Sequence, residues 1–276
     1  MGVNAKNVVP DDRFEFGDNW RKFLALLDEE RIAAAEKSLL KVLEVDNLKG
    51  KKILDIGSGS GLFSLAARRL GAHVHSFDYD PQSVACTKEL KRRFYPDDPE
   101  WTVEHGDILD RGYLKALGQY DIVYSWGVLH HTGAMWEALE NVAPLVAPKG
   151  MLFIAIYNYQ VFWSAFHVAM KRLYVKAPRI GKWLIAAAFI LFQMTKGFVA
   201  DLVTFRNPGQ RYRERKKDRG MSCCYDWIDW VGGYPFEVAK PEEIFEFFRE
   251  RGFNLLKLKT CGGGHGCNEY VFKRVP

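Results

Sequence analysis

The chain is poor in the residues that mark extracellular or fibrous proteins. Its 276 residues include five cysteines and eleven prolines, and a small, odd number of cysteines is typical of a reducing compartment rather than of a disulfide framework. The opening 14 residues lack the basic and apolar stretches of a secretory signal peptide. Apolar residues make up 48% and charged residues 26%, near the averages for folded domains, which excludes a disordered or collagen-like chain. We therefore expect a folded cytoplasmic protein.

An excess of charge of one sign is confined to one short segment. Residues 206–219 hold seven Lys or Arg and two Asp or Glu, a net charge of +5 that equals the formal net charge of the whole chain. The rest of the chain is balanced. A broad basic face for nucleic acid is therefore not expected.

An uninterrupted apolar run of membrane-spanning length is also missing. Residues 183–191 are almost wholly apolar, but Lys196 and Asp201 interrupt the pattern before the ~18 to 20 residues that a span requires. Two interpretations of residues 183–219 remain open. The first, which we favour, is a core-packed lid helix followed by a solvated basic loop. The second is a helix lying on an anionic membrane surface, which would make the protein membrane-associated.

Short apolar runs alternate with helix-like stretches over much of the chain. Residues 51–158 show this alternation, and residues 241–276 resume it with one helical and two strand-like segments. Repeated strand–helix units predict an α/β protein with a doubly wound parallel sheet. Helical spacing within residues 1–50 predicts an N-terminal helical cap.

Residues 159–240 do not fit the alternation and are interpreted as an insertion after the fifth strand. The segment 157–236 holds 17 of the chain's 39 aromatic residues. An aromatic segment at the active-site edge of a sheet can exclude water and shape a pocket. We expect it to be a lid or substrate region.

A glycine-rich loop follows the first predicted strand. Gly57, Gly59 and Gly61 alternate with serines before a helical stretch, and glycines let a backbone approach a ligand closely while the helix offers free N–H groups at its start. The dinucleotide fingerprint requires a small residue at position 62, where this chain has Leu62. The loop therefore predicts a nucleotide-like ligand other than NAD or FAD.

Acidic residues near the ends of three successive strands indicate which chemical groups the ligand carries. Asp55 can accept a hydrogen bond from an ammonium group, Asp78 from both hydroxyls of a ribose, and Asp107 from an adenine amino group. Tyr79 and Ile108 stand beside them as apolar surfaces for a purine. Ammonium, ribose and adenine together describe S-adenosylmethionine (SAM).

The motifs LDIGSGSG, SFDYD, HGDILD, YDIVYSWGVLHH and LVAPKGMLFIAIYN resemble the successive motifs of class I SAM-dependent methyltransferases, in the subgroup of ubiquinone-type and type 11-12 enzymes. The resemblance implies a Rossmann-like, seven-stranded sheet with the last strand antiparallel. It also implies SAM as the cofactor, with the glycine loop under its methionyl group and Trp126 near the transferable methyl. The expected cofactor-binding residues are Asp55, Gly57, Ser58, Gly59, Gly61, Asp78, Tyr79, Asp107, Ile108 and Trp126.

Two adjacent histidines follow the fourth predicted strand. Methyl transfer to a hydroxyl requires loss of a proton, and an unperturbed imidazole, with a pKa near ~6.5, can accept it. We expect an oxygen acceptor on a small molecule, with His130, or secondarily His131, as the general base. The alternative is that both rings only pack and cap the next helix.

A cluster of acidic and aromatic residues at positions 225–237 is the best candidate for the substrate pocket, although its tryptophans could equally anchor the insertion. The expected substrate residues are Tyr225, Asp229, Trp230 and Glu237, with Asn268 in the last loop. The sequence does not predict the oligomeric state.

No metal site is expected. Cys223, Cys224, Cys261, His265 and Cys267 do not match the usual C-x-x-C spacing of zinc sites, and the role of these cysteines stays open. The N/D-P-P-Y/F motif of amino-directed nucleic-acid methyltransferases is absent. A sulfur or nitrogen acceptor, a lipid-like acceptor at a membrane surface, and a non-catalytic SAM-binding protein are the remaining alternatives.

Overall fold

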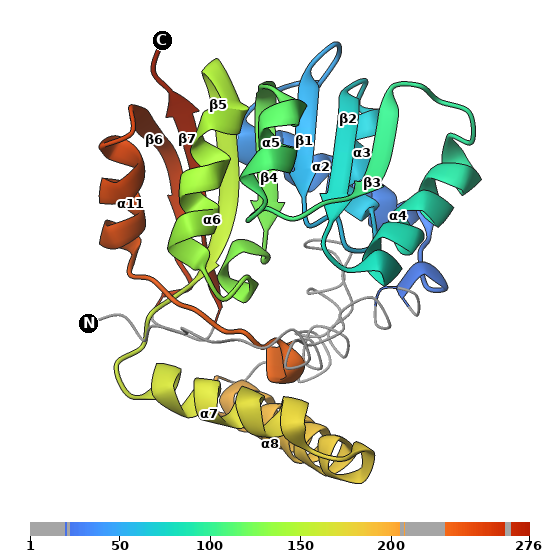
Figure 1. Ribbon diagram of the computed structural model, residues 1–276. Helices are drawn as coiled ribbons and strands as arrows, with labels where there is room; N and C mark the ends of the chain where they lie inside the picture. The colour runs from blue at the N-terminus through green and yellow to red at the C-terminus, as the bar shows by residue number, and fades with distance from the viewer. Residues whose placement is uncertain (1–19, 21–22, 205–206, 208–229, 263–265) are drawn as a thin grey trace.

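Seven strands form one sheet in the order β3-β2-β1-β4-β5-β7-β6 (Figure 1). The computed structural model describes residues 20, 23–204, 207, 230–262 and 266–276. Strands β1 to β5 run parallel, and β7 pairs antiparallel with both β5 and β6. The predicted Rossmann-like fold with an antiparallel last strand is confirmed. The strands are β1 Lys52–Ile56, β2 His73–Asp78, β3 Trp101–His105, β4 Tyr120–Trp126, β5 Val146–Tyr157, β6 Phe253–Lys259 and β7 Cys267–Arg274.

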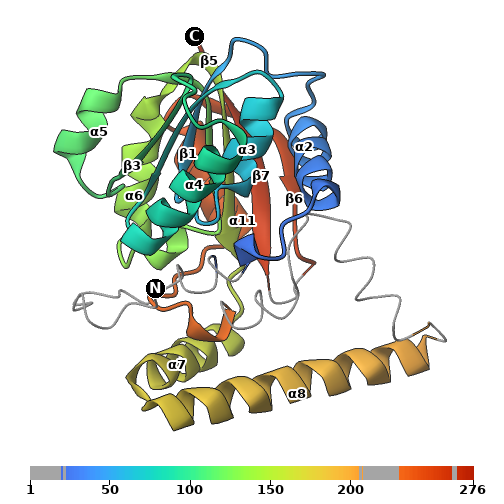
Figure 2. The ribbon, with the colours of Figure 1, turned by 90° about the vertical axis from the view of Figure 1, so that its right-hand side faces the viewer.

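Helices cover both faces of this sheet (Figures 1 and 2). The central strands are buried on both sides, as parallel strands require: in β1, Leu54 packs in one core cluster and Ile53 in the other. The first cluster takes in α5 Arg111–Leu117, α6 Met135–Val142 and α11 Pro241–Arg249, and the second takes in α2 Glu29–Leu43, α3 Leu62–Arg69 and α4 Pro81–Phe94. Two short 3₁₀ helices, η2 Leu129–His131 and η3 Ala143–Leu145, flank α6.

Aspartate side chains start three of these helices. Asp28, Asp80 and Asp110 accept hydrogen bonds from backbone N–H groups in the first turns of α2, α4 and α5. Capping of this kind satisfies donors that have no partner within the helix. It fixes where each helix leaves the strand or turn before it.

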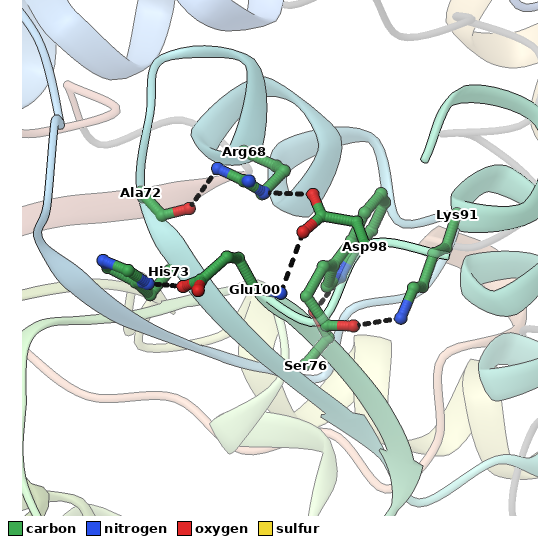
Figure 3. A network of polar contacts seen from close by, with 8 residues as sticks. Arg68, Ala72, His73, Ser76, Lys91, Asp98 and Glu100 are labelled. Carbon is green, nitrogen blue, oxygen red and sulfur yellow. Dashed lines mark hydrogen bonds and ion pairs between the residues drawn. The ribbon is translucent and has the colours of Figure 1, made fainter. Parts of the chain in front are cut away.

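A polar network holds the outer strand β3 to the helices beside it (Figure 3). Arg68 donates to the carboxylate of Asp98 and to the carbonyl oxygen of Ala72, while the Lys91 ammonium group donates to the carbonyl oxygen of Trp101. These contacts fix the segment between α4 and β3 and the start of β3.

The insertion leaves the sheet at the end of β5 and returns to the same place. Asn158 and Ala239 form a β-bridge, Tyr159 N donates to Ala239 O at 3.1 Å, and Ala239 N donates to Tyr157 O at 3.0 Å. Between them lie α7 Trp163–Lys176 and α8 Arg179–Val203. Figure 2 shows both helices as a separate layer beyond the end of β5, with α8 lying lengthwise below the core.

Candidate active site

The glycine loop turns back under the end of β2. Gly57 N and Ser58 N both donate to Phe77 O, at 2.8 and 3.2 Å, and Gly57, Gly59 and Gly61 all have positive φ angles, of 76°, 55° and 80°. A Cβ added at Gly57 would lie 2.4 Å from a methyl of Val128. The loop thus needs glycine both for its backbone conformation and for its close packing.

Asp78, at the end of β2, is joined to the glycine loop. Its carboxylate accepts a hydrogen bond from Gly59 N at 2.9 Å and one from Asp80 N at 2.9 Å. Burial raises the pKa of Asp78 to about 6, although these two hydrogen bonds oppose the rise. A carboxylate has about four acceptor positions, so two remain for hydroxyl donors such as those of a ribose.

Asp55 lies beneath α3 rather than on the open loop. It is 3% exposed, and it accepts a hydrogen bond from the hydroxyl of Ser64, which is itself 2.8 Å from the hydroxyl of Ser76. Burial raises the pKa of Asp55 to about 7. The predicted contact between Asp55 and an ammonium group stays a prediction.

The predicted adenine contacts stand at or just after the ends of β2 and β3, two strands that pair side by side. Asp78 pairs in register with His105, and the exposed Tyr79 ring lies 6.1 Å from the His105 ring. Asp107 Oδ1 accepts a hydrogen bond from Leu109 N at 2.9 Å, and Ile108 is buried. The Tyr79 ring is therefore accessible to a planar ligand.

Trp126, at the end of β4, is anchored to the last strand. Its indole N–H donates to Glu269 Oε1 at 3.1 Å. Next to it Gly127 has a φ of 75°, and a Cβ added there would meet no atom within 4 Å. The sheet edge is open at Gly127, beside the end of β1, where the resemblance puts the transferable methyl.

The two histidines lie inside the protein. His130 is fully buried, with its ring centroid 4.5 Å from that of His131 and 4.1 Å from that of Tyr157. Burial, and after it the charges of His131 and Lys171, hold the pKa of His130 well below its ordinary value. Burial and Lys171 likewise lower the pKa of His131 to about 3. Both rings are neutral at neutral pH, so the expectation of a base with an unperturbed pKa is wrong, while the base role itself stays a prediction.

Sequence reasoning missed Lys171, which lies in α7 and is fully buried. Its ammonium nitrogen is 4.4 Å from the ring centroid of Trp230, 4.7 Å from that of Phe236 and 5.9 Å from that of Tyr157. A cation enclosed by ring faces is stabilised by their negative electrostatic potential. The rings come from positions far along the chain, and no local motif marks Lys171 as their common partner.

The predicted substrate residues that the structure describes all hold the insertion in place. Trp230 stacks on Phe189, with centroids 4.7 Å apart and planes at 12°. Glu237 accepts a hydrogen bond from Met135 N at 2.9 Å at the start of α6, and burial raises its pKa to about 7. Asn268 donates to Asn158 Oδ1 at 3.0 Å. These contacts favour the anchoring interpretation of the cluster.

Several predicted positions lie outside the described residues. They are Tyr225, Asp229, Cys223, Cys224, His265 and most of the basic run 206–219. Within the described part of the chain, no three His, Cys, Asp or Glu side chains come together as a metal site.

The amino-acid sequence matches one family of known proteins. The family profile described as a methyltransferase domain matches residues 27–197. Curated relatives include two ubiquinone biosynthesis O-methyltransferases. The one from Rhodopseudomonas palustris (strain TIE-1) is 27% identical over 154 residues, 56% of either chain. The one from Erwinia tasmaniensis is 34% identical over 116 residues, 41% of this chain and 45% of the relative. The chain thus spans about half the length of the curated relatives it matches.

Solved structures share the fold over nearly the whole chain. Magnesium protoporphyrin IX methyltransferase from Synechocystis PCC 6803, with bound SAH, superposes with a TM-score of 0.54 at 16% identity, covering 93% of both chains. The putative methyltransferase bound to the Trm112 activator of Haloferax volcanii gives a TM-score of 0.54 at 14% identity, covering 96% of this chain and 99% of that one. At these identities the likeness concerns the fold alone.

Proposed function

The chain belongs to the methyltransferase-domain family and has the class I SAM-dependent fold. From this membership we propose that it transfers the methyl group of SAM to an oxygen atom of a small-molecule acceptor. The observation that carries the proposal is the link between Asp78 and Gly59. The Asp78 carboxylate binds the glycine loop and still has acceptor positions for ribose hydroxyls. The loop expected under the methionyl group and the residue expected on the ribose are therefore in direct contact.

The residues of the site fit SAM in shape as well as in charge. A side chain cannot be added at Gly57 in the glycine loop, because its Cβ would clash with Val128. At Gly127, just after the neighbouring strand β4, an added Cβ would meet no atom within 4 Å. Tyr79 offers an exposed ring beside Asp78. When bound, SAM supplies both the methyl group and its own leaving group, so the chain has to orient the acceptor, exclude water and remove a proton.

We assign removal of the proton to His130. Its neutral imidazole can accept a proton, and its low pKa makes it a weak base, which suits an acidic hydroxyl such as that of a phenol better than an aliphatic alcohol. The buried ammonium group of Lys171, which already lowers the pKa values of both histidines, would stabilise negative charge on a phenol oxygen. The curated relatives named as O-methyltransferases support an oxygen acceptor.

A lipid-like acceptor is the second candidate for this activity, and one observation favours it. Helix α8 carries large apolar side chains that are exposed to solvent, and it belongs to the insertion that we propose as the substrate region. An acceptor held in a bilayer would then be methylated at the membrane surface. Sulfur and nitrogen acceptors differ from these two candidates because a thiolate or a neutral amine can attack the methyl group without a general base.

Calorimetry and a transfer assay test the proposal. Wild-type protein should bind SAM with a micromolar Kd, and Asp78→Ala should weaken binding roughly 10- to 100-fold because a charge-assisted hydrogen bond to the ribose is lost. Gly59→Arg should weaken binding strongly as well. Asp46→Ala, at an exposed aspartate outside the site, is the matched control and should bind normally.

Incubation with methyl-labelled SAM and separate sets of phenols, thiols and amines then identifies the acceptor class. Label should pass to phenols. Equal SAM affinity in wild type and the folded Asp78→Ala variant, or tight binding of NAD, would overturn the cofactor assignment. Label transferred only to thiols or amines would overturn the oxygen assignment.

A further inference from the structure

The outer face of α8 is apolar along its whole length. Ile180, Leu184, Leu191, Phe198 and Leu202 follow one another at intervals of four, seven, seven and four residues, which places them on one side of a helix. Each is at least 55% exposed. At 1.5 Å per residue the 25-residue helix is about 37 Å long, and monomeric soluble proteins rarely expose an apolar surface of that extent.

Exposed aromatic side chains also stand at the starts of α7 and α8. Phe162, Trp163 and Phe166 are exposed, Phe162 at 86%, and Trp183 near the start of α8 is 69% exposed. Figure 2 shows no described helix or strand on the side of α8 that faces away from the sheet. Tryptophan is enriched where a protein meets the headgroup region of a membrane.

The charges of the two helices are almost all of one sign. The accessible cations are Arg172, Lys176, Arg179, Lys182 and Lys196, and the single acidic residue of the two helices, Asp201, is 2% exposed. In the sequence, α8 is followed directly by the basic run 206–219. A second copy of this chain would bring these cations against one another, whereas an anionic surface would attract them.

The inner face of α8 is packed against protein. Phe189 stacks on Trp230, and Gly197 and Asp201 are buried. The helix is long and apolar enough to cross a membrane by composition alone, but a crossing helix would lose these contacts and expose the Asp201 carboxylate to lipid, which is costly. The packing therefore favours a helix that lies in the membrane surface.

We propose that the outer face of α7 and α8 docks onto a bilayer that contains anionic lipids, with the apolar row of α8 in the boundary between headgroups and acyl chains and the exposed α7 cations Arg172 and Lys176 on the headgroups. The evidence for this docking surface is the exposed side chains of the insertion and is independent of the methyl-transfer chemistry. The docking deepens the proposed function by placing the substrate region where a lipid-like acceptor would enter.

Flotation of the purified full chain with lipid vesicles tests the proposal. The protein should float with vesicles of phosphatidylcholine mixed with phosphatidylglycerol at low salt, and less at high salt, because salt screens the attraction to the headgroups. Vesicles of phosphatidylcholine alone should bind it more weakly. A triple variant, Leu184→Ser, Leu191→Ser and Phe198→Ser, should reduce binding to the mixed vesicles by roughly tenfold or more, because it removes buried apolar area.

The matched control removes three exposed apolar side chains elsewhere. Leu26, Leu256 and Leu258 are 46%, 55% and 42% exposed, and their replacement by serine should leave vesicle binding unchanged. Lys176→Glu, at an exposed cation on the outer side of α7, should weaken the salt-sensitive part of binding. SAM affinity, measured in parallel, should be the same in all variants, so a failure of the cofactor assignment is seen separately.

Three outcomes would overturn the proposal. The first is equal flotation of wild type and the α8 triple variant. The second is a dimer in analytical ultracentrifugation that the triple variant dissociates, without any binding to vesicles, because the face would then be an interface between copies. The third is resistance of the vesicle-bound protein to alkaline carbonate extraction, which would indicate a helix that crosses the bilayer.

Discussion

The carboxylate of Asp78 accepts a hydrogen bond from the backbone N–H of Gly59, at 2.9 Å between the two atoms. These residues belong to different strand–helix units, and the bond fixes the turn of the glycine loop relative to the end of β2. The parallel pairing of β1 with β2 brings the two together. The loop conformation is therefore set by the fold itself, so the ligand does not have to impose it.

SAM binding should depend on pH through Asp78. The pKa of Asp78 in the protein is about 6, and hydroxyl donors bind its ionised form, so binding lowers that pKa and releases a proton near pH 6. The Kd should rise about tenfold for each pH unit below 6. Calorimetry in two buffers of different ionisation enthalpy measures the proton release. A Kd that stays constant from pH 8 to pH 5 would contradict the assignment.

Replacing Gly57 by alanine should destabilise the protein by about 1 to 3 kcal/mol, because φ is positive at this residue and the new methyl group would overlap the side chain of Val128. Thermal or urea unfolding measures the loss. Adding Val128→Ala should recover only part of it, since that change relieves the overlap and leaves the backbone strain. Full recovery in the double variant would show that the positive φ carries little cost.

The buried carboxyl of Asp55 should make stability fall with rising pH. Its pKa in the folded state, about 7, lies above the unfolded value near ~3.9, so between these values the folded state holds the extra proton. The free energy of unfolding then decreases as pH rises from about 4 to about 7. Asp55→Asn is neutral throughout and should show a flatter curve in urea unfolding. Identical slopes in the two proteins would mean that Asp55 is ionised across this range.

His130→Ala should keep the affinity for SAM and lower kcat roughly 100-fold, as expected for loss of a general base. Because the pKa of His130 lies well below 6.5, wild-type activity should show no titration of this group between pH 6 and pH 8. His131→Ala should have a smaller effect, since the His131 ring is held against the carbonyl oxygen of Pro235. Normal turnover by His130→Ala would point to an acceptor that needs no base, such as a thiolate.

Trp230→Ala should impair acceptor use more than SAM binding. The indole packs on Phe189 and covers the Lys171 ammonium group, so its loss opens the packing of the insertion while the glycine loop keeps its own contacts. We expect a raised KM for the acceptor and a nearly unchanged Kd for SAM. Trp136→Ala, at a half-exposed tryptophan on α6, is the control. Parallel loss of SAM affinity in Trp230→Ala would show that the insertion supports the cofactor site as well.

The sequence predicts the sheet and the glycine loop well because both depend on local patterns. Short apolar runs mark strands that are buried on both faces, and glycines at alternate positions mark a turn that needs positive φ angles. Asp78 was predictable for the same reason, since its place at a strand end follows from the chain order.

The histidines and the insertion were harder to predict because their environment comes from distant segments. The pKa of His130 is lowered by burial, then by His131 and by Lys171, and of these causes only His131 is adjacent in the sequence. Glu237 accepts a hydrogen bond from Met135 N at the start of α6, more than 100 residues earlier in the chain, and its predicted substrate role stays a prediction. Contacts between residues so far apart in the sequence depend on how the insertion folds back onto the core, and the spacing of apolar residues does not predict this.

The bridge between Asn158 and Ala239 closes the insertion into a loop whose two ends meet at the end of β5. The chain leaves the end of β5 and comes back to it before α11 begins, so both ends of the insertion join the sheet at one point. The Gly59–Asp78 hydrogen bond lies outside this segment. In the proposed function, acceptor and membrane contacts come from the insertion, whereas the cofactor contacts come from the sheet that the insertion leaves and rejoins.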